Sequence, residues 1–242
     1  LFIIPFLLLK VYADNLIIAS GDTVEMSGTH VYDLVSITNS SILSVESEVG
    51  TLKIICDSLH LGGTSKIIAD GISTDTSNGG QDYQALAGGG AGAGFGGFGG
   101  NGGGTETALG SEPYGNCFSF LKGNKGGTGH SVYDGDYPGG NGGGAIWIES
   151  RVSNIFGKIS AKGDDGIQYD SFGSWPSGPD WGGSGGGSGG QIYIESSIIN
   201  FSDQSLISVK GGNGGVPLQG ADADTTNPGG GGGGSGGRIT IL

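Results

Sequence analysis

The residues best able to do chemistry are closely spaced aspartates in glycine-rich stretches. Carboxylates at such spacing can bind hard cations such as Ca²⁺. Aspartates beside glycine are also common turn formers that accept hydrogen bonds from their own backbone. We therefore expect no cofactor, with bound Ca²⁺ as the alternative. The candidate metal ligands are Asp134, Asp136, Asp164, Asp165, Asp222 and Asp224.

The other groups able to do chemistry are scattered. The three histidines, His30, His60 and His130, are far apart in the sequence, and two cysteines are too few for a zinc knuckle. No Gly-x-Ser-x-Gly stands between a strand and a helix, the setting that activates a serine nucleophile. We therefore assign no catalytic residue and predict that the chain is not an enzyme.

Aromatic side chains supply the candidate binding residues. Each could contact a glycan or a neighbouring subunit, and for each the alternative is burial beneath a loop. The candidates are Trp147, Tyr193, Trp175, Trp181, Phe95 and Phe98.

The composition restricts the elements that can position these residues. There are 57 glycines in 242 residues, and each glycine costs a helix interior about 1 kcal/mol relative to alanine, so a helical bundle is excluded. Collagen is excluded because glycine is irregularly spaced and only 7 prolines occur. With 35% hydrophobic residues the chain can bury a core. A net charge of −13 opposes binding to nucleic acid or to anionic membranes.

The N-terminal residues 1–13 (LFIIPFLLLKVYA) are apolar and end in Val-Tyr-Ala. They resemble the end of a secretory signal peptide and are too short to span a membrane, as is every later apolar segment; a buried first strand is the alternative. Export would place the protein outside the cell or on its surface. There Cys56 and Cys117 would form a disulfide, with two buried thiols as the alternative. Asn39 and Asn200 begin Asn-x-Ser acceptors for N-glycosylation.

Short alternating strands are predicted through residues 14–76. Apolar residues at i and i+2 are separated by Ser, Thr, Asn and Gly clusters, as in residues 42–45, 52–54 and 59–61. Strands this short are marginal in a free-standing sheet, but they suit a stacked array in which neighbouring coils share one core.

Residues 77–242 contain a repeat of about 46–48 residues. Gly143–Ser150 matches Gly189–Ser196, and Gly236–Leu242 begins a third copy. The alternation places the isoleucines of each copy on one face, with Trp147, Tyr193 and Thr240 on the other. Glu149 and Glu195 recur beside them, which hints at a bound ion between stacked carboxylates.

Glycine-rich excursions join these strands. Phe95 and Phe98 stand three apart in one run, with the period of a polyproline II helix, and are predicted to dock on the strands. A flexible linker is the alternative. The resulting fold prediction is an all-β, right-handed parallel β-helix (solenoid) with glycine-rich, polyproline-II-like excursions. Its parts are a signal-peptide remnant (1–13), N-terminal coils (14–76) and glycine-rich coils (77–242), truncated at the C-terminus.

This pattern resembles the glycine-rich parallel β-helix regions of secreted and cell-surface proteins. These include haemagglutinin-like and autotransporter-like passengers and glycine-rich extracellular proteins of plants and protists. The resemblance covers residues 50–242 and rests on Gly-Gly-x-Ile-x-Ile, Ile-Ser-Ala-Lys-Gly and the glycine runs. It implies a non-catalytic structural or adhesive surface module, self-assembling into a fibre or matrix, whose partners are glycans or copies of itself.

Two other functions remain as alternatives. Polysaccharide-degrading β-helix enzymes are similar in outline, but their Asn-Thr-Asp, Gly-His-Gly and Arg-Ile-Lys motifs are absent here. Ice-binding proteins include bundles of glycine-rich polyproline-type helices, which this chain resembles only over a short Gly-x-x stretch.

Overall fold

The protein is described by a computed structural model over residues 15–77, 79–82, 88–104, 107–116, 118–131, 135–167, 182–217 and 228–242. These residues contain thirteen strands, and none forms a helix long and apolar enough to cross a membrane. The strands are β1 (Leu16–Ile18), β2 (Thr23–Met26), β3 (Gly28–Ile37), β4 (Ile42–Val45), β5 (Thr51–Leu61), β6 (Lys66–Ile68), β7 (Gly129–Ser131), β8 (Gly135–Tyr137), β9 (Ala145–Ile155), β10 (Lys158–Ser160), β11 (Gln191–Phe201), β12 (Leu206–Ser208) and β13 (Arg238–Ile241).

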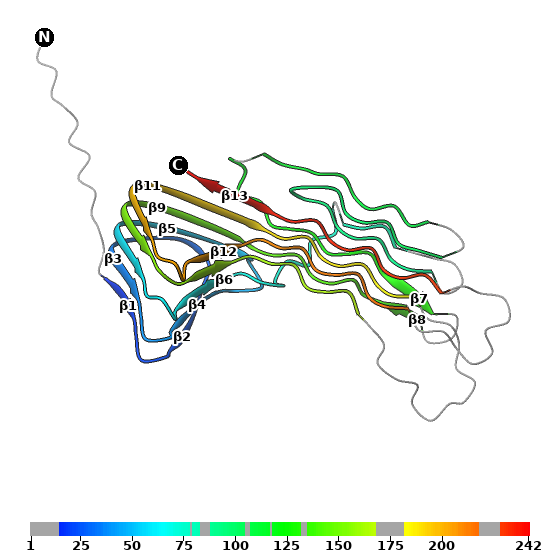
Figure 1. Cartoon of the computed structure of the whole chain (residues 1–242), viewed down its shortest axis with the longest axis horizontal. Helices are drawn as coiled ribbons and strands as arrows, with labels where there is room; N and C mark the ends of the chain where they lie inside the picture. The colour runs from blue at the N-terminus through cyan, green and yellow to red at the C-terminus, as the bar shows by residue number, and fades with distance from the viewer. Residues whose placement is uncertain are drawn as a thin grey trace, which may run out of the picture.

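Two parallel sheets hold most of these strands. Sheet A has the order β1-β3-β5-β9-β11-β13, and sheet B has the order β12-β10-β6-β4-β2. The chain alternates between the sheets, and each of the long strands β3, β5, β9 and β11 of sheet A is followed by a shorter strand of sheet B (Figure 1). Strands β7 and β8 form a separate antiparallel pair. Strands from residues 14–76 and from residues 77–242 therefore share the same sheets.

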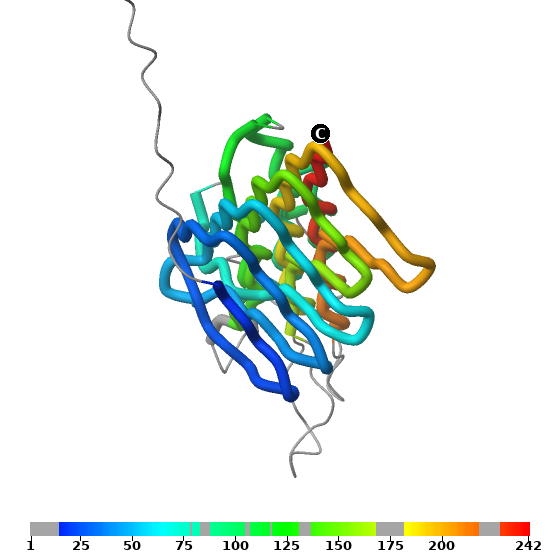
Figure 2. The backbone as a smooth tube through the Cα atoms, turned by 90° about the vertical axis from the view of Figure 1, so that its left-hand side faces the viewer, coloured from blue at the N-terminus to red at the C-terminus, as the bar shows by residue number. Residues whose placement is uncertain are grey.

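The strand register follows the repeat in the sequence. Ile146 pairs with Ile192 and Ile148 with Ile194, and β13 continues both rows through Ile239 and Ile241. The predicted in-register aliphatic rows are thus confirmed. In sheet B, Ile159 pairs with Ile67 and with Ile207. Figure 2 shows the strands stacked as successive layers from the N-terminus towards the C-terminus.

One core lies between the two sheets. Alternate side chains of the long strands point into it because the side-chain period of a strand is two. In β5 the burial pattern alternates from Thr51 to Cys56 and again from Ser58 to Leu61, with the break at Asp57 and Ser58. The core includes the fully buried side chains Leu43, Leu52, Ile54, Leu59, Leu61, Ile67, Ile146, Ile148, Ile155, Ile159, Ile192 and Ile194.

The glycine-rich runs pack beside the sheets and form a second body, here called the glycine layer (Figure 1). Its central run, residues 182–190, is buried throughout. The backbone of this run is hydrogen-bonded to six flanking segments: 124–130, 229–235, 161–164, 140–143, 90–93 and 212–215. Every third amide returns to the same neighbour: Gly183, Gly186 and Gly189 donate to Gly229, Gly232 and Ser235, each at 2.9 Å.

Close backbone approach explains why glycine fills this layer. A Cβ added at Gly186 would overlap the carbonyl oxygen of Gly212, and one added at Gly234 would overlap that of Gly187. The linker alternative is wrong for these runs, because their amides and carbonyls bond to one another.

The prediction of a right-handed parallel β-helix (solenoid) is wrong. The strands form two separate open parallel sheets rather than a closed solenoid. Among the described residues, each repeat supplies one strand to each of the two sheets. The rest of the repeat is rich in glycine, which has no side chain to add to a shared core. The glycine runs pack through their backbone instead, so within the described ranges no third parallel sheet closes the coil.

Several elements also differ from the prediction. Strand β1 follows directly on the segment assigned to a signal peptide, and residues 1–13 lie outside the described residues. The predicted strands at 52–54 and 59–61 are two parts of the single strand β5. Polar residues Asp57 and Ser58 interrupt the apolar pattern there, while pairing with β3 and β9 keeps the backbone extended.

Candidate functional site

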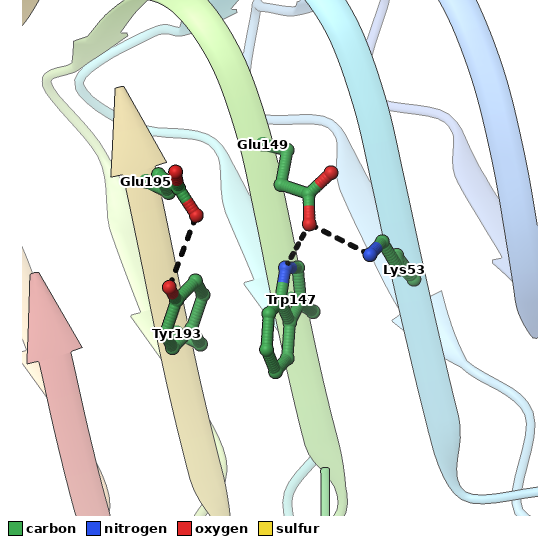
Figure 3. Close-up of polar contacts among 5 residues, drawn as sticks. All are labelled: Lys53, Trp147, Glu149, Tyr193 and Glu195. Atoms are coloured by element: carbon green, nitrogen blue, oxygen red, sulfur yellow. Dashed lines mark hydrogen bonds and ion pairs between the residues drawn. The ribbon is translucent and has the colours of Figure 1, made fainter. Parts of the chain in front are cut away.

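The outer face of sheet A brings together the charged and aromatic side chains that the repeat singled out. Lys53, Trp147 and Tyr193 are register partners on β5, β9 and β11. Two residues further along, Glu149 and Glu195 are also partners. Figure 3 shows the five side chains projecting from one face.

The aromatic rings stack on each other. The centroids of Trp147 and Tyr193 are 3.8 Å apart with the rings tilted by 21°. On the neighbouring strand, the Lys53 Nζ lies 4.9 Å from the Trp147 ring centroid. Phe120 packs edge-on against the indole at 5.6 Å between centroids. With Tyr193 and Lys53 on opposite sides of it, the indole has no free face for a sugar ring.

Both glutamates accept hydrogen bonds from protein groups. Glu149 accepts hydrogen bonds from Lys53 Nζ at 2.7 Å and from Trp147 Nε1 at 2.8 Å. Glu195 accepts one from the Tyr193 hydroxyl at 3.0 Å. Lys53 therefore neutralises Glu149, and the bound ion hinted at by the sequence stays a prediction.

A cavity of about 340 Å³ opens beside this row. It is lined by Ile55, Cys56, Asp57, Glu149, Ser150, Arg151 and Glu195. Arg151 donates to both carboxylate oxygens of Asp57, at 2.8 and 2.9 Å. This bidentate pair occupies the guanidinium edge that would otherwise recognise an anionic ligand.

Cys56 is chemically quiet. Burial, reinforced by the charge of Asp57, raises the pKa of its thiol to about 12. Only the thiolate is a nucleophile or a metal ligand, so this sulfur is inert at neutral pH. Cys56 is a free, buried cysteine in the structure. Cys117 lies outside the described residues, and the disulfide stays a prediction.

The predicted aromatic contacts fall into three groups. Tyr193 is 3% exposed and Phe95 is 0% exposed, so burial is the right interpretation for both. Phe95 packs against Tyr114 and beneath the Arg238 guanidinium. Phe98 is 71% exposed and does not dock on the strands. Trp175 and Trp181 lie outside the described residues.

The predicted metal ligands are not brought together within the described ranges. No group of three or more His, Cys, Asp or Glu side chains there could hold a metal ion. Asp164 lies beside Asp165 and near Asp70, and the pKa of its carboxyl is raised, first by desolvation and then by those two charges. Asp165 accepts a 2.6 Å hydrogen bond from the backbone amide of Asn213, 48 residues further along the chain, so it links two glycine-rich segments. Asp134, Asp222 and Asp224 lie outside the described residues, as does the side chain of Asp136.

The two glycosylation acceptors occupy different settings. Asn39 lies in an exposed turn with a φ of 56°, a left-handed conformation that asparagine tolerates. Asn200 is exposed on β11, and its amide donates to Asn154 Oδ1 at 2.8 Å. Glycosylation at either asparagine stays a prediction.

Sequence reasoning missed Lys53, Phe120 and the Asp57–Arg151 pair. The available signal was the alternation of Thr51–Leu61, which runs in phase with Ala145–Ile155 although no Gly-Gly pair precedes it. Reading residues 51–61 as a further copy of the repeat would have placed Lys53 beside Trp147 and Asp57 level with Arg151.

The chain matches no family model, and comparisons with curated proteins and with solved structures found no similar protein.

Proposed function

We propose that this chain is a non-catalytic structural or adhesive module of an extracellular or cell-surface assembly, in which the glycine layer acts as a rigid platform. The observation that carries the proposal is the central run 182–190, buried and hydrogen-bonded to six neighbouring segments. Glycine loses more conformational freedom on folding than any other residue. Ordering a layer of it is costly, and rigidity is the property such a layer supplies.

The outer face of sheet A supports the same proposal. Its aromatic and charged groups are engaged with one another: Trp147 with Tyr193 and Lys53, and Arg151 with Asp57. Groups that neutralise and stack on their own neighbours stabilise a surface.

Hydrogen exchange of the full chain tests the platform. We expect the amides of Gly183 and of residues 185–189 to exchange as slowly as those of β9, because both sets are buried and hydrogen-bonded. The exposed turn at Asn39 and Ser40 is the internal control for fast exchange. Fast exchange throughout 183–189 would show a flexible linker and would overturn the proposal.

The same preparation tests the enzymatic alternative. Incubation with polygalacturonate and other acidic polysaccharides should release neither reducing ends nor unsaturated uronates. Co-sedimentation with such polymers, without product release, would support an adhesive function. Product release that increases with the concentration of this protein would contradict the non-catalytic assignment.

Ice binding is the second candidate function, favoured by the threefold hydrogen-bond period of the glycine layer. A layer of glycine segments bonded in this way resembles one class of ice-binding protein more closely than the sequence alone does. Thermal hysteresis of the full chain would establish this function, and its absence at high protein concentration would remove it.

A further inference from the structure

The outer face of sheet B gathers four of the chain's ten basic residues. They are here called the lysine patch: Lys66, Lys158, Lys162 and Lys210. Their neighbours in the chain belong to the core or pack against it: Ile67, Ile159, Ala161 and Val209. Because successive side chains point to opposite faces of a strand, the lysines project from the face that is turned away from the core.

The patch sets its lysines side by side in two rows. Lys66 of β6 and Lys158 of β10 are register partners. The register of β10 with β12, extended by two residues, places Lys162 beside Lys210, and the Gly163 amide donates to the Lys210 carbonyl at 2.9 Å. Neighbouring strands are about 4.8 Å apart, and like charges placed opposite each other destabilise a sheet.

None of the ion pairs among the described residues includes a lysine of the patch. Asp70 is on the same face, but its Oδ1 accepts a hydrogen bond from the Lys162 backbone amide at 2.8 Å and its Oδ2 accepts one from the Ser160 hydroxyl at 3.0 Å. The cations of sheet A show the other arrangement, since Lys53 is paired with Glu149 at 2.7 Å. The lysine patch therefore collects positive charge that the described carboxylates do not neutralise.

The pKa of Lys158 reflects this crowding. Desolvation lowers the pKa of its ammonium group, and the charges of Lys162 and Lys66 lower it further, while Asp70 acts in the opposite direction. The charged form of Lys158 is therefore disfavoured in the folded chain. A bound anion would reverse that effect, because a nearby opposite charge favours the charged form.

We infer that the lysine patch binds a linear acidic polysaccharide, a polymer of uronate or sulfated sugars; this ligand specifies the proposed adhesive function, on which the inference rests. The two rows are four residues apart along β10, about 13 Å. One polysaccharide strand lying along β10 would therefore pass Lys158 and Lys162 in turn, with Lys66 on one side and Lys210 on the other.

A thin polyanion fits this surface better than a broad one. The chain has a net charge of −13, and the exposed Asp164 and Asp165 follow Lys162 directly. A membrane or a nucleic acid duplex spreads its charge over a wide area and would be repelled by the surrounding carboxylates. Single-stranded nucleic acid binds by stacking its bases on aromatic rings. The outward residues between the two lysine rows offer no such ring: Ile68, Ser160 and Ser208.

Polymer binding by the full chain tests this surface. The probes are polygalacturonate and dextran sulfate, with neutral dextran as the control, in co-sedimentation at low and at high salt. We expect a charged polymer to bind and dextran not to bind, and salt should weaken the binding because it screens exposed charges. Comparison of the two charged probes shows whether carboxylate or sulfate is preferred. Binding of neither, or equal binding of dextran, would overturn the inference.

A matched pair of variants locates the site. Lys158→Gln combined with Lys162→Gln removes two charges from the patch, and we expect the Kd for the bound polymer to rise about tenfold. Lys122→Gln combined with Lys125→Gln makes the same change of net charge outside the patch and should leave the Kd almost unchanged. Equal weakening by the two pairs would show attraction to the charge of the whole chain and would contradict a localised site.

Thermal melting gives a readout that a purely structural role of Lys158 would not produce. Without polymer, Lys158→Gln should melt at or above the temperature of the parent, because Lys66 no longer faces a like charge. The polymer that binds should raise the melting temperature of the parent more than that of the variant, since a ligand stabilises the state that binds it. A variant that melts below the parent and also loses binding would argue for a structural role and against the inference.

Two further results separate this inference from the proposed function. Binding to phosphatidylserine vesicles or to polyuridylate, but to neither acidic polysaccharide, would overturn the inference in favour of another polyanion. Slow hydrogen exchange of Gly183 and residues 185–189 without polymer binding would remove the inference and keep the proposed rigid platform. Polymer binding together with fast exchange in that run would do the reverse.

Discussion

At the scale of single residues, contacts among neighbours on sheet A decide what the recurrent side chains do. Trp147 and Tyr193 recur at one register position, and the structure uses them as a stack capped by Phe120 and flanked by Lys53. Repetition of an aromatic residue on neighbouring strands therefore reflects stabilisation of the sheet as readily as ligand binding.

Replacing Trp147 with leucine tests this role. The Trp147→Leu variant keeps apolar bulk but loses the ring stack and the hydrogen bond to Glu149. Aromatic pairs contribute about 0.5–1.5 kcal/mol beyond area burial, so we expect the free energy of unfolding to fall by about 1–2 kcal/mol in urea denaturation. Phe98→Leu, at an exposed position, should leave it almost unchanged.

Two aspartates should respond to pH with opposite signs. The pKa of Asp164 is raised in the folded protein, chiefly by desolvation. The ionised Asp164 carboxylate therefore lowers the free energy of unfolding. This destabilisation is absent well below the ordinary pKa of 3.8 and is complete once the pH has risen through the pKa of the folded state. We therefore expect Asp164→Asn to melt at a higher temperature than the parent near neutral pH, with the difference vanishing in acid.

Asp75 provides the opposite case. A 2.9 Å hydrogen bond from the Ser77 amide lowers the pKa of its carboxyl. That stabilisation is present above the ordinary pKa and is lost as the pH falls through the folded value. Asp75→Asn should melt below the parent near neutral pH and converge with it in acid. Melting differences of the same sign for both variants would show that another group controls the response.

At the scale of elements, the glycine layer is held by backbone contacts that a single methyl group can block or spare. Gly234 and Gly233 are neighbours in one run. An added Cβ at Gly234 would overlap the Gly187 oxygen, while one at Gly233 would meet nothing closer than 3.6 Å.

The two alanine variants should therefore differ in sign. Gly234→Ala should lower the free energy of unfolding by about 1–3 kcal/mol, the usual cost of overpacking. Gly233→Ala should leave it unchanged or raise it by about 0.4–1 kcal/mol, because alanine restricts the unfolded chain. Chemical denaturation of both variants measures the difference, and equal losses would contradict the packing described.

Much of the strand arrangement was predictable from the sequence. That the sheets stay open, with the glycine runs packed beside them, was not. Ile146, Ile192 and Ile239 revealed parallel register, because side-chain alternation and a constant repeat length leave one in-phase alignment. The path of the glycine runs could not be predicted, because residues 182–190 have almost no side chains to indicate a buried face. Lys53 was missed because its strand lacks the Gly-Gly pair that marked the other copies.

At the scale of the whole molecule, the two parallel sheets and the glycine layer are built from the same repeats. The repeats supply strands to both sheets and glycine runs to the layer, and the runs are hydrogen-bonded to one another. The sheets and the layer therefore have to fold with one register.

The period of three in the glycine layer limits how this chain can change in length. Residues 229–234 are all glycine, so sliding the run by three residues returns every amide to an equivalent acceptor, whereas sliding by one or two turns each amide towards a different neighbour. Removal of three of these glycines should preserve a cooperative melt, and removal of one or two should not. Insertions and deletions in such runs should therefore accumulate in multiples of three codons. The hydrogen-bond geometry of the layer would impose this restriction in addition to the reading frame.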